Sequence, residues 1–353
     1  MNRTLLALAL MGVTSGAAYA QSSVTLYGEL DAGLLYTNKT LAPTTGGNAG
    51  SNFSLIDGGR APSFFGFTGT EDLGGGLKAK FKIESGINVA NGGLNNSNGN
   101  QFGRQAWLAL DGNFGEFKAG LQFSPFFLAV DESDPRAFSL FGSGALPYVN
   151  SAIGTGIFNS NAVSYTTPRF AGLQGRAMLA LGGSPGDFQA GRQYSFAVNY
   201  EHGGLTANAA FYDGNAGGTA NTPVPTNLGF EGRMLGVSYA YGPVIAKASF
   251  VNYKVAGSAN NNVYGGGLTY YVSPAFDVNG GVWVTSDRDH TTNHSVLAAL
   301  GAEYFLSKTT SLYAQVGLVD NHGAMDTGLS ITGALNEVPG TTTGADIGIR
   351  HTF

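Results

Sequence analysis

Alternating polar and apolar positions recur along this chain at the spacing of extended strands. The segment 193–201 reads QYSFAVNYE, and its apolar positions all share one parity. They are Tyr194, Phe196, Val198 and Tyr200. Because successive side chains of an extended chain point to opposite faces, the segment predicts a strand with one apolar face and one polar face.

The same two-residue period returns in many segments between connectors of two kinds. Clear examples are 23–36, 77–85, 205–212 and 311–318. Short turns alternate with long connectors rich in Gly, Asn, Thr and Pro, which lie near 38–61, 89–100, 124–158, 183–192, 214–230, 255–260, 287–293 and 321–342. Counting between them gives about sixteen antiparallel strands of roughly ten residues, the length that crosses a bilayer when tilted.

Such a long sheet, apolar on one side, is predicted to close on itself within lipid, with the polar face turned inward. Closure removes the unpaired strand edges that hydrocarbon cannot satisfy. The alternative is a soluble β-sandwich that buries its apolar face against a second sheet. A barrel of about sixteen strands leaves an aqueous lumen. Trp107, Tyr200 and Tyr270 are interpreted as outward aromatic residues at the membrane interfaces.

Composition and the N-terminus agree with an exported membrane protein. Only 12% of the 353 residues are charged, 43% are hydrophobic, and there is no cysteine. Residues 1–20, MNRTLLALALMGVTSGAAYA, have the basic start, apolar core and small-residue end of a signal peptide, which leaves a barrel domain over 21–353. A net charge of −5 without a basic patch argues against a nucleic-acid partner, and we expect no cofactor and no metal.

Several ordered motifs resemble the Gram-negative general porins of the beta-proteobacterial type. They are SSVTLYGELDAG, TEDLGGGLKAKFKIESG, FGRQAWLAL, NAVSYTTPRFAG and the terminus IGIRHTF. The resemblance covers the whole mature chain. It implies an all-β, sixteen-stranded barrel in the outer membrane, assembled as a homotrimer. It also implies that Phe353 is the C-terminal aromatic signal for the outer-membrane barrel assembly machinery, and that a third external loop folds into the lumen.

The resemblance and strand parity together predict the residues of a pore constriction. On the loop side, the longest connector carries Asp131, Glu132, Asp134 and Arg136. On the wall side, the candidates are Arg60, Phe64, Lys78, Lys80, Lys82, Arg104 and Lys118. Acidic and basic groups that face each other across a narrow passage sort small hydrophilic solutes and ions by size and charge.

Departures from the family pattern concern the wall. Phe64, Thr68, Leu121 and Ser164 stand where relatives commonly carry arginine. We therefore expect weak or cation-leaning selectivity, with an apolar spot at Phe64. The expected function is a passive diffusion channel without enzymatic activity. The alternatives are a substrate-specific channel, which a solute would block, an outer-membrane barrel enzyme, and an adhesin, which would not conduct.

Overall fold

The computed structural model describes residues 23–151, 156–215 and 226–353, so the predicted signal peptide lies outside the described part. The first strands are β1 (Ser23–Thr37), β2 (Asn52–Asp57), β3 (Phe64–Gly74), β4 (Leu77–Gly86), β5 (Gln105–Gly112), β6 (Gly115–Phe123), β7 (Phe158–Thr166), β8 (Leu173–Ala180) and β9 (Gln193–His202). The later strands are β10 (Leu205–Asn215), β11 (Gly229–Tyr241), β12 (Val244–Val255), β13 (Asn260–Ser273), β14 (Phe276–Asp287), β15 (His294–Phe305), β16 (Thr310–His322), β17 (Thr327–Ser330), β18 (Ala334–Asn336) and β19 (Gly340–Thr352). Two helices, α2 (Pro125–Ser133) and α3 (Ala145–Ser151), follow β6.

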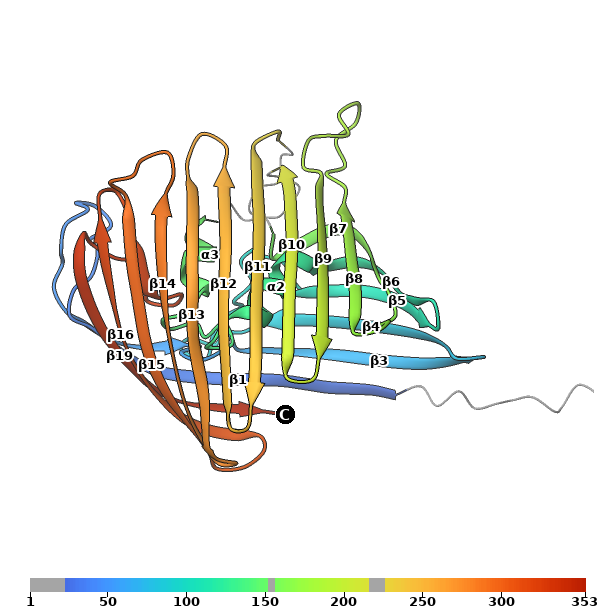
Figure 1. The fold of residues 1–353 in the computed structure, drawn as a ribbon, viewed down its shortest axis with the longest axis horizontal. Helices are drawn as coiled ribbons and strands as arrows, with labels where there is room; N and C mark the ends of the chain where they lie inside the picture. The colour runs from blue at the N-terminus through green and yellow to red at the C-terminus, as the bar shows by residue number, and fades with distance from the viewer. Residues whose placement is uncertain (1–22, 152–155, 216–225) are drawn as a thin grey trace, which may run out of the picture.

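The strands form one closed antiparallel wall in which chain neighbours pair with each other (Figure 1). The first and last strands close the ring, from Glu29 opposite Thr352 to Thr37 opposite Gly344. β2 pairs with the second half of β1, and β3 pairs with its first half. β2 and β3 therefore share one position in the wall. The predicted closed barrel of sixteen antiparallel strands is confirmed.

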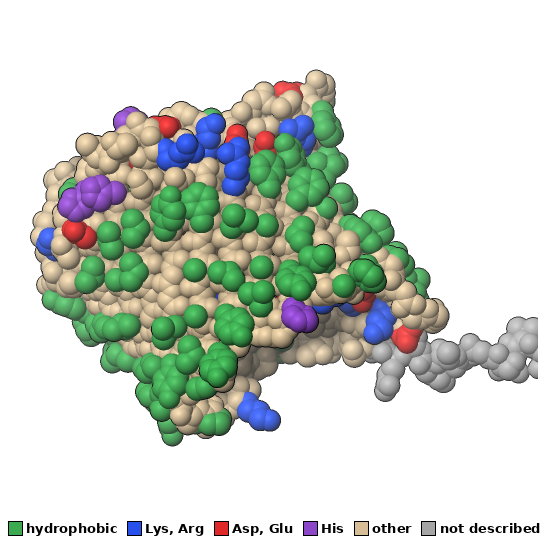
Figure 2. Space-filling view, in the orientation of Figure 1, with side chains coloured by type: hydrophobic (Ala, Val, Ile, Leu, Met, Phe, Trp, Pro, Cys, Tyr) green, Lys and Arg blue, Asp and Glu red, His purple; other side chains and the backbone are tan. Residues whose placement is uncertain are grey.

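The apolar parity of the strands faces outward, as the two-residue period predicts. In β9, Phe196 and Val198 are half exposed, whereas Ser195 and Ala197 are buried on the inner side. Figure 2 shows hydrophobic side chains spread across the outer surface of the strands, with charged side chains gathered towards one rim. An exposed apolar surface this large is typical of contact with lipid rather than with water.

Trp107 is the exception to our interpretation of the aromatic residues, because it faces the lumen. It lies opposite Lys82 of β4, and the Lys118 ammonium lies 4.6 Å from its ring centroid. The outward positions of β5 are instead Leu108 and Leu110. Both parities of this strand carry apolar residues, so alternation alone did not fix its faces.

Short turns close one end of the barrel and longer connections lie at the other, as predicted, but three long connectors differ in detail. The connector near 38–61 contains β2, and the connector near 321–342 contains the β17–β18 hairpin. The connection between β12 and β13 has only the four residues 256–259. Among the described residues, neither helix has the length and apolar character needed to cross a bilayer.

Candidate functional site: the barrel interior

The long connector after β6 folds against the inner face of the barrel wall, and we call its described part, residues 124–151, the inner loop. Its first helix, α2, begins where Ser124 accepts a hydrogen bond from the amide of Phe127, with Pro125 in the first turn. A serine cap followed by proline is a typical helix start. The helix packs on β8–β12, and α3 packs on β12, β17 and β18.

An aromatic cluster attaches the inner loop to this wall. Phe126 is fully buried, and its ring centroid lies 6.2 Å from those of Tyr212 in β10 and Tyr253 in β12. Tyr148 of α3 joins the cluster at 5.5 Å from Tyr253. Burial of a phenylalanine side chain contributes about 2 kcal/mol, so this cluster is a substantial anchor.

Glycines on the inner face of the wall allow the loop to approach closely. A Cβ at Gly232 would overlap the ring of Phe126, and a Cβ at Gly281 would lie 3.0 Å from Pro135. A Cβ at Gly301 would lie 2.7 Å from the Arg136 guanidinium. The inner loop therefore follows a path of side-chain-free positions across β11, β14 and β15.

Arg136 is the polar anchor of the loop. Its guanidinium donates to Oδ1 of Asn279 (2.9 Å) and to the carbonyls of Phe141 (2.8 Å) and Gly142 (2.7 Å), and also to Oε1 of Gln315. The planar, five-donor geometry of arginine suits this set of acceptors. The loop is thus tied to β14 and β16, whereas the aromatic cluster attaches it to β10 and β12.

The four charged residues expected on the loop side divide into two pairs. Asp134 and Arg136 are 3% and 2% exposed, and Asp134 accepts the amides of Arg136, Phe138 and Gly144. Asp134 therefore organises the loop internally and Arg136 anchors it to the wall, whereas we expected both to line the passage. Asp131 and Glu132 are only partly buried at the end of α2. Burial and the neighbouring Asp134 raise the pKa of Asp131 to about 6.

Two cations of the wall hold the end of α2, and neither was predicted from the sequence. Arg176 of β8 forms an ion pair with Glu132 at 2.8 Å, and Lys247 of β12 donates to the Glu132 carbonyl at 2.8 Å. Strand parity places both side chains inside the barrel, so the sequence could have identified them as residues that face the lumen. Their contact with α2 depends on where the loop packs against the wall, and the alternation of polar and apolar residues does not predict that position.

The inner face of β3–β6 and the segment before β5 carries most of the predicted wall residues, and we call it the basic wall. Its members are Phe64, Lys78, Lys80, Lys82, Arg104, Trp107 and Lys118. Lys82 lies 5.0 Å from the ring of Tyr27, and the Arg104 guanidinium lies 4.8 Å from the ring of Phe64. The basic groups are thus supported by aromatic faces, an arrangement that favours cations by about 1 kcal/mol at such sites.

Carboxylates neutralise several of these cations. Arg104 pairs with Glu84 at 2.6 Å, and Lys80 pairs with Asp111 at 2.6 Å and with Glu116 at 3.4 Å. Lys118 lies 3.1 Å from Glu116. Among the described residues, Lys78 and Lys82 have no carboxylate within 4 Å.

Arg60 lies apart from the basic wall, in the inward detour between β2 and β3. Asp31 holds this detour by accepting the amides of Gly59, Arg60 and Ala61 at 2.7–3.2 Å. The Arg60 guanidinium donates to the Arg136 carbonyl at 3.1 Å and lies 3.4 Å from Glu303. It therefore connects the inner loop to the wall at β15.

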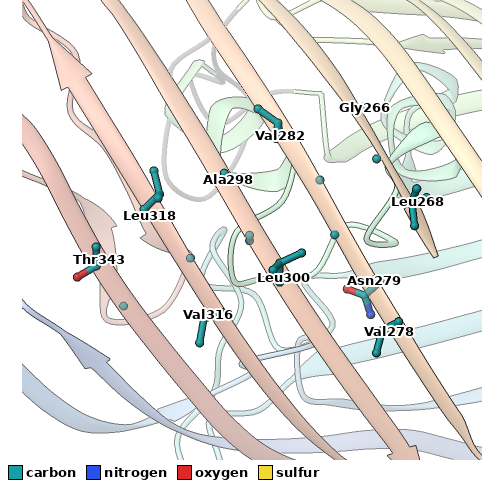
Figure 3. A pocket seen from close by; sticks show the side chains of 16 residues that line it. Gly266, Leu268, Val278, Asn279, Val282, Ala298, Leu300, Val316, Leu318 and Thr343 are labelled. Carbon is teal, nitrogen blue, oxygen red and sulfur yellow. The ribbon is translucent and has the colours of Figure 1, made fainter. Parts of the chain in front are cut away.

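A concavity of about 780 Å³ lies on the outer face of β13–β16 and β19 (Figure 3). Leu268, Val282, Leu300 and Val316 line it, together with glycines. It is apolar and lies on the lipid-facing parity, so it is not part of a solute path. In the parts of the chain that the structure describes, no three His, Asp or Glu side chains are grouped as metal ligands.

A closed sixteen-stranded wall with an apolar exterior and a polar, charged interior defines a transmembrane β-barrel channel. Comparisons with known proteins specify it further. The family model described as Gram-negative porin matches residues 6–324. Outer membrane porin protein 32 of Delftia acidovorans is 31% identical and an outer membrane porin protein of Bordetella pertussis is 30% identical, each over all of both chains.

Solved structures agree. The anion-selective porin from Comamonas acidovorans is similar with a TM-score of 0.82 at 28% identity, covering 94% of this chain and 100% of that one. The trimer form of OmpT from Vibrio cholerae is similar in fold, with a TM-score of 0.66 at 17% identity over 94% of this chain and 99% of that one. This chain belongs to the Gram-negative porin family. It is an outer-membrane channel for passive diffusion of small hydrophilic solutes, and not an enzyme.

Proposed function

We propose that solutes pass between the inner loop and the basic wall and are sorted there by size and charge. The observation that carries this proposal is the placement of the loop. Its helices pack on β8–β12, β17 and β18, while the side chains of Phe64, Lys82, Arg104 and Lys118 project from the inner face of β3–β6. Asp131 and Glu132 supply the acidic side, and Asp134 and Arg136 maintain the shape of the loop.

The charge balance of this constriction favours weak selectivity. Four of the predicted cations, Arg60, Lys80, Arg104 and Lys118, already lie within 4 Å of carboxylates. Paired charges present little net field to a permeating ion. Phe64 adds an apolar surface beside Arg104 rather than another cation. The Comamonas acidovorans relative is described as anion-selective, and we propose that this chain has a weaker preference.

Reversal-potential measurements in a potassium chloride gradient test this proposal. We expect a reversal potential near zero for the wild type. Phe64→Arg should shift the permeability ratio towards chloride by roughly two- to fivefold, because one added charge at contact distance in water contributes about 1 kcal/mol. Phe64→Gln is the uncharged control and should resemble the wild type. A strong chloride preference in the wild type would contradict the proposal.

We also propose that residues 1–20 are removed on export and that 21–353 form the mature domain. Assembly as a homotrimer and recognition of Phe353 by the barrel assembly machinery rest on family resemblance. The structure is compatible with recognition of Phe353, because its backbone pairs with that of Gly28 at 2.9 and 3.0 Å while its ring remains half exposed. N-terminal sequencing, native mass determination and a Phe353 deletion test the three statements separately.

A further inference from the structure

A second polar cavity lies at the long-loop end of the barrel, on the other side from the basic wall, and we call it the vestibule cavity. Its volume is about 560 Å³, within the range of small-molecule sites. Four segments enclose it: α3, the turn 256–259 with the start of β13, the end of β14 with its connection to β15, and residues 324–327. None of the predicted constriction residues lines it.

The lining supplies hydrogen-bond acceptors and negative charge. Its polar members include Asn150, Ser151, Asn261, Asp287, Asp326 and Thr327, together with His290 beside Asp287. Among the described residues, no lysine or arginine lines it. Asn261 is 8% exposed, and its Nδ2 atom donates to the Ser151 hydroxyl at 3.4 Å. Its Oδ1 atom has no partner within the described residues. A buried acceptor without a donor favours a ligand that brings one.

The two carboxylates are held in place by the surrounding loops. Asp287, which is 5% exposed, accepts the amide of Asp289 at 2.9 Å and the side-chain amide of Asn293 at 3.3 Å, and it lies 3.2 Å from Nδ1 of His290. Asp326 accepts the side-chain amide of Asn336 at 2.7 Å. Fixed acceptors on strand ends are preorganised for a ligand, so less ordering is needed on binding.

We propose that the vestibule cavity binds a small, hydroxyl-rich solute carrying a protonated amine, the chemistry of an amino sugar. Hydroxyl groups match the neutral acceptors of Asn, Ser and Thr, and an ammonium group matches the carboxylates of Asp287 and Asp326. No lysine or arginine among the described lining residues competes with that ammonium. The site would concentrate such a solute at the outer entrance before it reaches the constriction.

Current-noise analysis of the purified full-length protein in planar bilayers tests this proposal, with glucosamine, N-acetylglucosamine and glucose as probes. We expect saturable interruptions of the current that depend on the glucosamine concentration. The affinity for the two neutral sugars should be at least about tenfold weaker, because hydrogen bonds to charged groups are roughly twice as strong as neutral ones. Asp326→Asn and Asn261→Ala should each weaken the effect of glucosamine by about tenfold.

Asp289→Asn is the matched control, because this exposed carboxylate lies in the same loop but does not line the cavity. It should behave as the wild type does, both in the presence of glucosamine and in its conductance without sugar. Absence of saturable interruptions up to about 100 mM glucosamine, equal effects of the three sugars, or wild-type behaviour of both Asp326→Asn and Asn261→Ala would overturn the proposal. Reversal potentials report the constriction independently, so the two proposals fail separately.

Discussion

Removal of the Arg136 guanidinium should release the inner loop from β14 and β16 while leaving the barrel closed. Four hydrogen bonds join this side chain to Asn279, Phe141, Gly142 and Gln315, and two of these acceptors lie on β14 and β16. In Arg136→Met, a side chain of similar length remains, but Asn279 Oδ1 and the carbonyls of Phe141 and Gly142 lose the guanidinium donor, and Gln315 Oε1 keeps only the Ser139 hydroxyl. The barrel strands keep their ladders, so the loss is local.

The expected cost follows from the burial of the site. Arg136 is 2% exposed, so no solvent replaces the lost donor. Breaking a buried charged network of this kind typically costs about 3–5 kcal/mol, with each bond to a charged group worth about 1.5–3 kcal/mol. A change of about 4 kcal/mol corresponds to a roughly thousandfold shift in the equilibrium between docked and released loop.

Single-channel recording measures this shift directly. We expect Arg136→Met to give larger conductance steps and more open-channel noise than the wild type. Arg136→Lys should be intermediate, because its ammonium keeps the charge but cannot reproduce the planar set of donors. Heat-modified migration in detergent gels checks that the barrel is folded. Wild-type conductance and noise in a folded Arg136→Met channel would refute this account of the loop anchor.

Three further predictions concern the loops. Because burial and Asp134 raise the pKa of Asp131 to about 6, cation permeability should fall as pH drops from 7 to 5, and reversal potentials of Asp131→Asn should lack this change. Burial raises the pKa of Glu337 to about 7, so the folded arrangement around this residue is most stable below the ordinary pKa of glutamate. Its stability should decrease by up to about 3 kcal/mol as the pH rises through 7. Hydrogen exchange in β17 should show that loss in the wild type and not in Glu337→Gln; equal pH dependence would contradict it. Gly232→Ala should push Phe126, and α2 with it, away from β11 at a cost of about 1–3 kcal/mol and increase channel noise. Gly229→Ala, where a Cβ meets nothing within 4 Å, should do neither.

The barrel could be predicted from the sequence alone, because strand alternation is a local property. Each side chain in a strand such as β9 faces lipid or lumen according to its parity, and the hydrophobic effect fixes which parity faces outward. The length of the connector after β6 likewise singled it out as a loop that folds into the lumen. Where both parities were apolar, as around Trp107, this signal was ambiguous.

The roles of the charged residues of the loop could not be predicted in this way, because they depend on contacts with segments that are distant in the sequence. Arg136 reaches Gln315, 179 positions away, and Asp31 accepts the Tyr313 hydroxyl from 282 positions away. The docking path depends on glycines such as Gly232 and Gly301, because the side chains of Phe126 and Arg136 lie where a Cβ would be. A period of two residues assigns a side chain to a face of the sheet, but it does not specify which distant segment will lie against that face.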